Sequence, residues 1–269
     1  MKRNHSRSPL TRSLARIGRA TAPQHRQAIK IDIQRLYDQG VRSLRDLRHV
    51  LQTADADPET RTASCWVIGR LRPSGWIHLL GAIVQTDPHA GVVQAATQQL
   101  LQHDTNAVHR VFRDAVSDGK EPVNRAGGAW ALGYLHAEGA TDLLIDIASR
   151  SSEAIEVRAE AVEALGYMSK SLPVEALIRL LADKNAIVRC EAAFSLGNLG
   201  DPRALPFLKS LAKDDTACAN LGRVSEVASQ ALRRIRMIQR SDSTTARPRR
   251  KQKTRKRSAT SSGHNKHRN

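Results

Sequence analysis

A nine-residue block that recurs along the chain constrains the fold more than any other feature of the sequence. The block begins with arginine and ends with Ile-Gly or Leu-Gly, and it occurs at Arg61–Gly69, Arg125–Gly133, Arg158–Gly166 and Arg189–Gly197. The arginines are spaced by 64, 33 and 31 residues, so the first interval equals two of the others. Self-similarity at a fixed period of this length is typical of solenoids and other repeat proteins.

Two weaker copies complete the series. Val92–Leu100 lies midway in the long interval, with Val93 at the arginine position, and Val224–Leu232 follows the fifth copy. Both copies lack the arginine, and Leu101 and Arg233 stand where the other copies have glycine. We interpret the last copy as a terminal cap, because its end is rich in arginine.

Each copy predicts two helices separated by a short break. In the copy that starts at Val157, small and apolar residues recur at helical intervals, and a second apolar series follows over 174–181. No stretch alternates convincingly between apolar and polar residues as a strand would. Because one helix pair cannot bury its apolar face alone, the repeats are expected to stack into an all-α solenoid with an extended binding surface.

The repeat also has a family resemblance. Val188–Gly197 follow the pattern Val-Arg-x-x-Ala-Ala-x-x-Leu-Gly without exception, and Val157–Gly166 departs from it only at Val162. This pattern resembles the bacterial HEAT-like repeats of phycobilisome-lyase-type proteins. The resemblance covers roughly residues 57–236 and implies an α-solenoid of about six HEAT-like helix pairs. The lyase association is a likeness of fold, and fold does not imply function.

The excess positive charge marks the ends of the chain. Residues 1–26 hold seven Lys/Arg and no acid, and residues 239–269 hold eleven Lys/Arg and one acid, whereas the segment between them is balanced. Clustered like charges repel one another and stay extended in solvent. We therefore predict disordered basic tails over 1–26 and 239–269, N-terminal capping helices over 27–56, and the repeat solenoid over 57–238.

The C-terminal tail carries the densest run of cations. Such a run can neutralise phosphates and release counterions without reading sequence, which favours nucleic acid or a ribonucleoprotein such as the ribosome as its ligand. An acidic protein, an anionic membrane, or a purely solubilising role are the alternatives. The nucleic-acid-binding candidates are Arg247, Arg249, Arg250, Lys251, Lys253, Arg255, Lys256 and Arg257.

The N-terminal basic segment is less specific. Leu10, Leu14 and Ile17 fall at helical spacing among arginines. A segment of this kind can be a transit peptide, a membrane-surface helix, a nucleic-acid arm, or a tail whose periodicity is accidental. No apolar run approaches the roughly 18 residues of a membrane span, so no integral membrane association is expected.

Aromatic residues follow one side of the predicted first helices. The position five after the arginine points away from the apolar centre of the helix, and it is aromatic in every second repeat. Aromatic clusters on a surface often mark binding sites, although a covering tail or an error of one residue in helical phase would bury them. The protein-binding candidates are Trp66, Arg70, Trp130, Tyr134, Tyr167 and Phe194.

No motif points to catalysis. The chain has no His-Glu pair, which argues against a HEAT-type di-iron hydroxylase, and it has no Gly-rich phosphate loop or nucleophile elbow. The predicted second helices carry both acidic and basic side chains, which is typical of solvated helix charges. These residues are Asp142, Asp146, Glu175 and Arg179. We therefore expect no catalytic residues, no metal and no cofactor, with a bilin-lyase-like or DNA base-excision enzyme as the less favoured reading.

The three cysteines, Cys65, Cys190 and Cys218, are widely spaced and odd in number. This pattern indicates neither a disulfide framework nor a zinc site, and it fits a reducing cytoplasm. The recurring arginine is expected to form structural ladders between repeats. Taken together, the sequence favours a bacterial, non-enzymatic scaffold or adaptor that binds a protein partner through the solenoid, with tails that tether nucleic acid or that only aid solubility.

Overall fold

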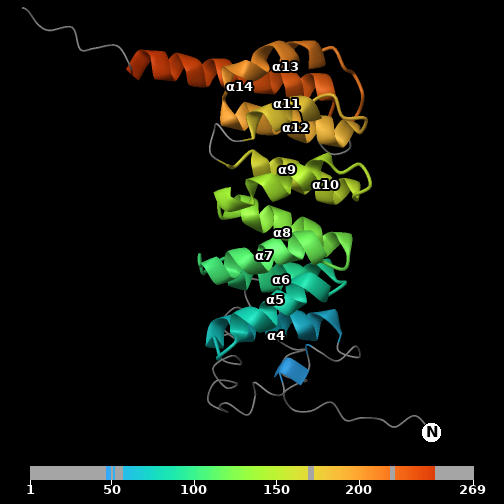
Figure 1. Ribbon diagram of the computed structural model, residues 1–269, viewed down its shortest axis with the longest axis vertical. Coiled ribbons are helices and arrows are strands. Elements are labelled where there is room, and N and C mark those ends of the chain that lie inside the picture. The colour runs from blue at the N-terminus through green and yellow to red at the C-terminus, as the bar shows by residue number, and fades with distance from the viewer. Residues whose placement is uncertain (1–46, 50, 52–56, 169–172, 219–221, 246–269) are drawn as a thin grey trace, which may run out of the picture.

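The computed structural model describes residues 47–49, 51, 57–168, 173–218 and 222–245, and over these residues the chain is an all-helical stack (Figure 1). No strand occurs among them, and Ala217 and Arg223 form only an isolated bridge. The predicted all-α solenoid is thus confirmed. Residues 1–26, residues 246–269 and most of the predicted capping segment, 27–56, lie outside the described residues.

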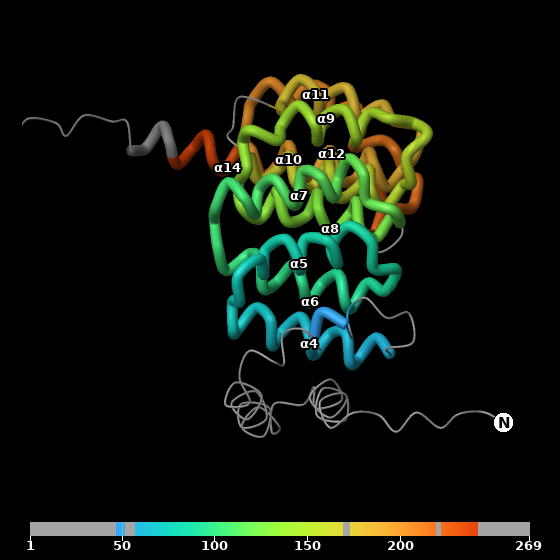
Figure 2. The backbone as a smooth tube through the Cα atoms, turned by 60° about the horizontal axis from the view of Figure 1, so that its bottom comes forward, coloured from blue at the N-terminus to red at the C-terminus, as the bar shows by residue number. Residues whose placement is uncertain are grey.

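Each repeat contributes a first helix and a second helix. Figure 2 shows the tube of the chain winding back and forth between these helices as the stack advances. The first helices are α4 (Pro58–Leu71), α6 (Ala90–Leu100), α8 (Pro122–Tyr134), α10 (Ile155–Leu165), α12 (Ala186–Leu199) and α14 (Val224–Thr245). The second helices are α5 (Trp76–Thr86), α7 (Asn106–Asp118), α9 (Thr141–Ser149), α11 (Val174–Leu180) and α13 (Leu205–Leu211). Short 3₁₀ turns, η2 (Glu138–Ala140) and η3 (Pro202–Ala204), precede α9 and α13.

As far as Thr245, where the described residues end, the last repeat contributes only a first helix. α14 packs against both α12 and α13, and its apolar residues are buried as far as Ile235. The helix then continues to Thr245, beyond residue 239 where the sequence placed the start of the tail, and Figure 1 shows this part projecting sideways from the stack. A single helix that covers the preceding pair closes the core at this end, as expected of a cap.

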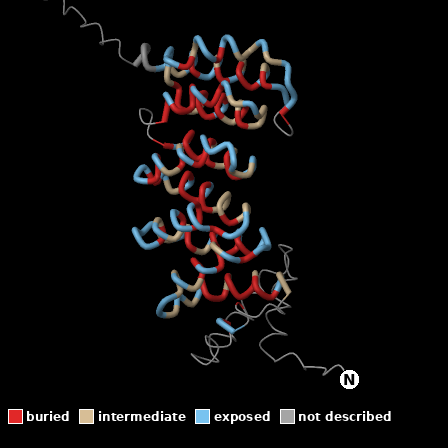
Figure 3. The backbone as a smooth tube through the Cα atoms, turned by 45° about the vertical axis from the view of Figure 1, so that its right-hand side comes forward, coloured by how far each residue is buried: buried red, intermediate tan, exposed pale blue. Residues whose placement is uncertain are grey.

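The core runs through the whole stack. Figure 3 shows buried residues along the interior and exposed residues along the outer sides. The buried side chains are mostly alanine, valine and leucine, and Phe112 is the one aromatic among the largest fully buried side chains of the described residues. Burial of each large aliphatic side chain contributes about 1.5–3 kcal/mol. The small ones allow close contact between helices.

The glycine that ends the repeated block sets the closest approach between successive first helices. A methyl group on Gly133 would lie 2.7 Å from Cα of Ala164, and one on Gly197 would lie 3.0 Å from Cα of Ala231. Equally close contacts arise at Gly69 and Gly166. In these four repeats the glycine faces the next first helix, so any side chain there would push the two helices apart.

The repeated arginine ties adjacent loops together. Arg189 forms an ion pair of 2.9 Å with Asp214, which follows the second helix of the same repeat, and its Nη1 donates to the carbonyl of Asp183 in the preceding loop at 2.8 Å. The same pairing within a repeat joins Arg61 to Asp87, Arg125 to Glu153 and Arg158 to Asp183. The ion pairs thus lie within repeats, whereas the sequence predicted ladders between repeats. The contacts that cross between repeats are hydrogen bonds from the arginines to carbonyls of the preceding repeat.

Arg158 is the most deeply buried of the four arginines. The Arg158 side chain is 2% exposed, and its Nε also donates to the carbonyl of Ala148 at 2.9 Å. Burial by itself would raise the pKa of Asp183, but hydrogen bonds from Arg158 and from the Asn185 amide hold it below its ordinary value. Both partners therefore stay charged, and the pair holds two loops at a fixed distance.

Candidate functional site: the outer face of the first helices

The aromatic residues singled out from the sequence lie on the exposed side of the first helices, which we call the outer face. Tyr134 is 61% exposed, Tyr167 41%, Trp130 38% and Phe194 37%. Trp66 differs from these four because it is partly buried against the core, although Arg70 on the same helix is exposed. The exposed members therefore lie on α8, in the turn that follows α10, and on α12, and their role in binding stays a prediction.

Trp130 and Tyr134 form one continuous aromatic surface on α8. They are four residues apart, so they project from the same side of the helix, and their rings stack with centroids 5.6 Å apart and an angle of 30° between planes. Rings that stack on each other and stay exposed present a flat apolar surface with a negative π face. Such a surface can pack against apolar groups or against cations.

Three glutamates that the sequence analysis passed over lie beside these rings. They are Glu160 and Glu163 on α10 and Glu191 on α12. The pKa of Glu160 is raised to about 7, mainly by burial and also by the charge of Glu163. The pKa of Glu191 is also raised to about 7 by burial and by both neighbouring glutamates. Near neutral pH Glu160 and Glu191 are therefore each protonated part of the time, because burial and mutual repulsion disfavour a full set of negative charges.

Tyr167 links the acidic cluster to the aromatic surface. Its hydroxyl donates to Oε1 of Glu163 at 3.1 Å. Burial and the three surrounding glutamates raise the pKa of Tyr167, so its hydroxyl keeps its proton and remains a donor. Among the described residues, no basic side chain forms an ion pair with Glu160, Glu163 or Glu191.

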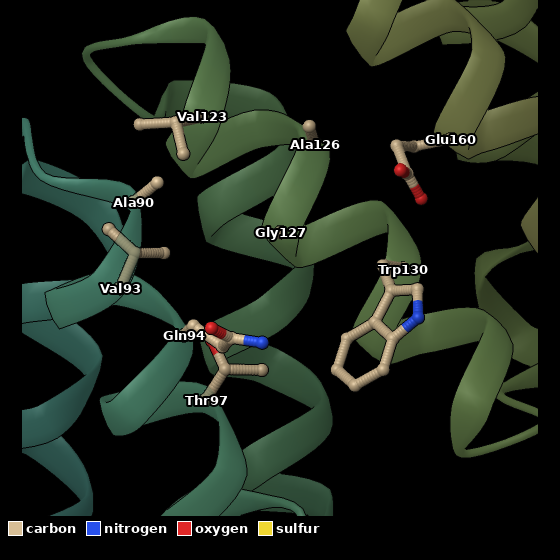
Figure 4. Close-up of a pocket in the computed structure, with 9 residues that line it drawn as sticks. All are labelled: Ala90, Val93, Gln94, Thr97, Val123, Ala126, Gly127, Trp130 and Glu160. Carbon is tan, nitrogen blue, oxygen red and sulfur yellow. The ribbon is translucent and has the colours of Figure 1, made fainter. Parts of the chain in front are cut away.

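A pocket opens on the outer face between α6, α8 and α10 (Figure 4). Its volume is about 270 Å³. Figure 4 shows the indole of Trp130 between the residues of α6 and the carboxylate of Glu160, which hangs toward it from α10. The residues that define its shape and polarity are Val93, Gln94, Thr97, Gly127, Trp130 and Glu160.

The pocket lies where the repeat departs from its pattern. Leu101 replaces the glycine that lets other first helices approach, and α6 and α8 pack less extensively than the other successive first helices. Val93, at the arginine position, lines the pocket. Gly127 opens it further, since it stands at the position that Glu160 and Glu191 occupy in the following repeats.

Two residues that line this pocket each hold an oxygen atom without a hydrogen-bond partner among the described residues. One is Oγ1 of Thr97, a residue that is only 2% exposed, and the other is Oε2 of Glu160. Both atoms are themselves buried, so what the pocket presents to solvent is the partly exposed side chain of Glu160 and the indole of Trp130.

The charges on the second helices are arranged differently. Asp146 pairs with Arg150 one turn later on α9, and Glu175 on α11 pairs with Arg203 at 2.9 Å. These groups neutralise one another at the surface, which agrees with the solvated charges expected there. They form no acidic or basic track comparable to the outer face.

The cysteine prediction was wrong for two of the three residues. Cys190 in α12 and Cys218 in the loop before α14 form a disulfide, with Cα atoms 6.7 Å apart, and Cys65 is buried and free. The two bonded residues are 28 positions apart, close to one repeat length, and stacking brings positions at such a separation side by side. A search for short Cys-x-x-Cys spacing could not find this pair. Burial raises the pKa of the Cys65 thiol far above its ordinary value, so it is inert.

Other predicted features fall outside this face. Arg247, Arg249, Arg250, Lys251, Lys253, Arg255, Lys256 and Arg257 lie outside the described residues. Within the described ranges, no group of three or more His, Cys, Asp or Glu is arranged to hold a metal ion. None of the described helices combines the length and the apolar character needed to cross a membrane.

Comparison with known families settles the nature of the repeats. The family model for HEAT repeats matches residues 44–133 and 141–233, which is more than half of the chain. The chain belongs to the HEAT repeat family. No curated protein shows significant sequence similarity to this HEAT repeat protein.

Solved structures resemble the HEAT repeat protein in fold alone. An engineered protein from the Northeast Structural Genomics Consortium matches with a TM-score of 0.50 and 17% identity over 87% of this chain and 66% of its own. A second engineered protein from the same consortium matches with a TM-score of 0.45 and 18% identity, over 71% of this chain and 96% of its own. Human deoxyhypusine hydroxylase in complex with glycerol matches with a TM-score of 0.32 and 18% identity, over 84% of this chain and 86% of its own. At these identities the likeness says nothing of activity.

Proposed function

We propose that this HEAT repeat protein is a non-enzymatic scaffold that binds a protein partner through the outer face of α8, α10 and α12. The observation that carries the proposal is the group of exposed aromatic side chains on successive first helices, Trp130, Tyr134, Tyr167 and Phe194. Aromatic residues dominate the energetics of protein interfaces, and monomeric proteins rarely expose them in clusters.

The scaffold beneath these rings supports this role. The arginine ladder and the glycine contacts hold successive first helices at fixed spacing, so the aromatic side chains are presented in a defined geometry. A preorganised surface loses less conformational entropy when a partner binds. A partner that spans two or three repeats can therefore contact rings on each of them.

The basic C-terminal segment supplies the second half of the proposal. Residues 247–257 hold eight lysines and arginines, and we propose that they tether the scaffold to nucleic acid or to a ribonucleoprotein. This contact is electrostatic, so it weakens steeply with salt. The outer face would then hold one partner while the basic segment holds another.

A cytoplasmic location belongs to the same proposal, and the Cys190–Cys218 pair provides its test. Disulfides persist mainly in oxidising compartments. Trapping of thiols in intact cells should find both cysteines reduced if the chain acts in the cytoplasm. Complete oxidation of the pair in cells would move the proposed location to an oxidising compartment.

The central experiment is affinity capture from a lysate with the full-length chain and with the double variant Trp130→Ala, Tyr134→Ala. The variant should lose protein partners that the full-length chain retains at high salt and after nuclease treatment. Phe207→Ala is the matched control, because Phe207 is 49% exposed but lies on the second helix α13. Equal capture by all three proteins would show that the outer face binds nothing.

A truncation after Thr245 tests the tether and leaves α14 complete. The truncated chain should lose its low-salt retention of RNA or DNA and keep its nuclease-resistant protein partners. Unchanged nucleic-acid retention would contradict the tether. If truncation removed no binding partner, the alternative would hold, in which the scaffold binds only protein and the tails aid solubility.

A further inference from the structure

The pocket between α6, α8 and α10 is lined by the carboxylate of Glu160 and the indole of Trp130 (Figure 4). Glu160 is partly exposed and has no basic partner among the described residues. A group that carries N–H donors and a positive charge can pair with this carboxylate and contact the ring. An anion would be repelled by the carboxylate.

The size of the pocket limits what can enter. At about 270 Å³ it falls below the roughly 300–1,000 Å³ of ordinary small-molecule sites. One long side chain fits a pocket of this volume. Gly127 has no side chain in the pocket, although glycine inside a helix costs about 1 kcal/mol relative to alanine, and a methyl group there would meet only Val93 at 3.3 Å. Unlike the other glycines of the repeat, Gly127 is not explained by tight packing.

The charge continues beyond the pocket. Glu163 and Glu191 extend the negative surface from Glu160 across α10 to α12, and Tyr167 and Phe194 lie exposed beside them. A free small cation would use the pocket alone. A peptide with repeated basic residues would use the pocket and the whole surface, so the arrangement favours a segment of polypeptide.

We propose that this pocket receives an arginine or lysine side chain from a basic segment of a partner protein, and that the rest of the segment lies along Glu163 and Glu191. The inference rests on the proposed function and names the chemistry of the partner. The chain's own C-terminal basic segment, which follows α14 at the far end of the stack (Figure 1), is the competing occupant, and truncation after Thr245 tests it.

A labelled peptide of alternating arginine and serine tests the proposal, with the full-length chain as receptor. Its matched counterpart replaces each arginine by citrulline, which keeps the shape and removes the charge. The arginine peptide should bind at least about tenfold more tightly than the citrulline peptide in physiological salt. Equal binding of the two peptides would overturn the proposal.

Pocket variants locate the site. Glu160→Gln and Trp130→Ala should each weaken binding of the arginine peptide about tenfold, as should Gly127→Leu, which fills the pocket while improving helix propensity. Glu156→Gln on the exposed first turn of α10 is the control and should leave binding unchanged. Equal losses for Glu160→Gln and Glu156→Gln would reduce the effect to diffuse charge and refute the pocket.

Two further arms separate the sources of the cation. Spermine, a free polyamine, should compete only weakly, because it lacks a backbone that follows α10 and α12. The chain truncated after Thr245 should bind the peptide as the full-length chain does. A tenfold gain on truncation would show that the chain's own segment fills the pocket, and strong competition by spermine would make it a polyamine site; either result overturns the proposal.

The outcome can be read apart from that of the scaffold itself. If capture of lysate proteins depends on Trp130 and Tyr134 but not on Glu160, and the arginine peptide does not bind, the proposed scaffold function is supported and the proposed basic partner is refuted. If capture does not depend on the aromatic residues at all, the proposed scaffold function is refuted.

Discussion

The second repeat and the fourth repeat have the same pair of helices, yet they differ in how closely they contact the repeat that follows. In the fourth, Arg158 pairs with Asp183 and Gly166 contacts Ser195 of the next first helix. In the second, Val93 replaces the arginine, Leu101 replaces the glycine, and Asp118 at the end of α7 is exposed. The fourth repeat is closed against its neighbour, whereas the second leaves a pocket.

This difference teaches that the arginine and the glycine of each repeat hold successive first helices together. The second repeat has lost both, and a pocket lies beside it, between α6, α8 and α10. The measurements below test this difference, beginning with the largest expected effect.

Removal of the buried arginine should lower the free energy of unfolding most. Arg158→Ala leaves Asp183 without its main partner, and we expect a loss of about 3 kcal/mol in the free energy of unfolding. Urea denaturation followed by circular dichroism measures it. Arg150→Ala is the control, because its pair with Asp146 on α9 is exposed and should contribute less than about 0.5 kcal/mol. Equal losses would remove the special role of the ladder.

A methyl group at the close junction should cost somewhat less. Gly133→Ala would place Cβ 2.7 Å from Cα of Ala164, and the helices must shift apart, at about 1–3 kcal/mol. The same denaturation experiment reports it. A neutral result would show that α8 and α10 can separate freely, and the contrast with the second repeat would then lose its physical basis.

The glutamates of the outer face should make stability depend on pH near neutrality. Because the folded pKa values of Glu160 and Glu191 are raised to about 7, their stabilising contribution is complete below about pH 4.5 and is lost as pH rises through 7. Unfolding at pH 5.5 and pH 8 should therefore show a loss that the double variant Glu160→Gln, Glu191→Gln lacks. We expect about 1–2 kcal/mol per group after allowance for solvent screening.

The acids of the ladder should give the opposite trend. Burial by itself would raise the pKa values of Glu153 and Asp183, but hydrogen bonds from arginine and from backbone amides, together with nearby positive charge, lower them. These pairs therefore stabilise the chain above about pH 4 and lose that effect as pH falls through the lowered pKa values. The double variant Glu160→Gln, Glu191→Gln should still lose free energy of unfolding at acid pH. If this loss at acid pH disappeared in the variant, the assignment of the two trends to separate groups would be incorrect.

The smallest effect is expected at the pocket. Gly127→Ala adds helix propensity worth up to about 1 kcal/mol, and its methyl group meets only Val93, which can move into the pocket. A small gain in stability, read beside the loss at Gly133, would show that two glycines of one helix serve different purposes. A loss comparable to that of Gly133→Ala would mean that Gly127 is also a packing glycine.

The sequence predicted those parts of the molecule that repeat. The block from Arg189 to Gly197 defines the register, and register alone places Trp130, Tyr134, Tyr167 and Phe194 on one side. The pocket arises from an exception to the pattern, Leu101, and its consequence depends on how far two helices separate. The Cys190–Cys218 bond depends on a loop that the repeat does not specify. The α14 boundary was also misplaced, since its charged residues beyond 239 read equally well as tail and as exposed helix.

The length of α14 has a consequence for how two ligands could share this molecule. Its buried residues end at Ile235, and the ten residues that follow rise about 15 Å along the helix axis before Thr245. The basic segment therefore starts from the tip of a rigid arm, away from the middle of the stack where Trp130 and Glu160 lie. A bulky polyanion on one side and a folded partner on the other can be held at once without collision, so their affinities should be independent and their effects on assembly additive.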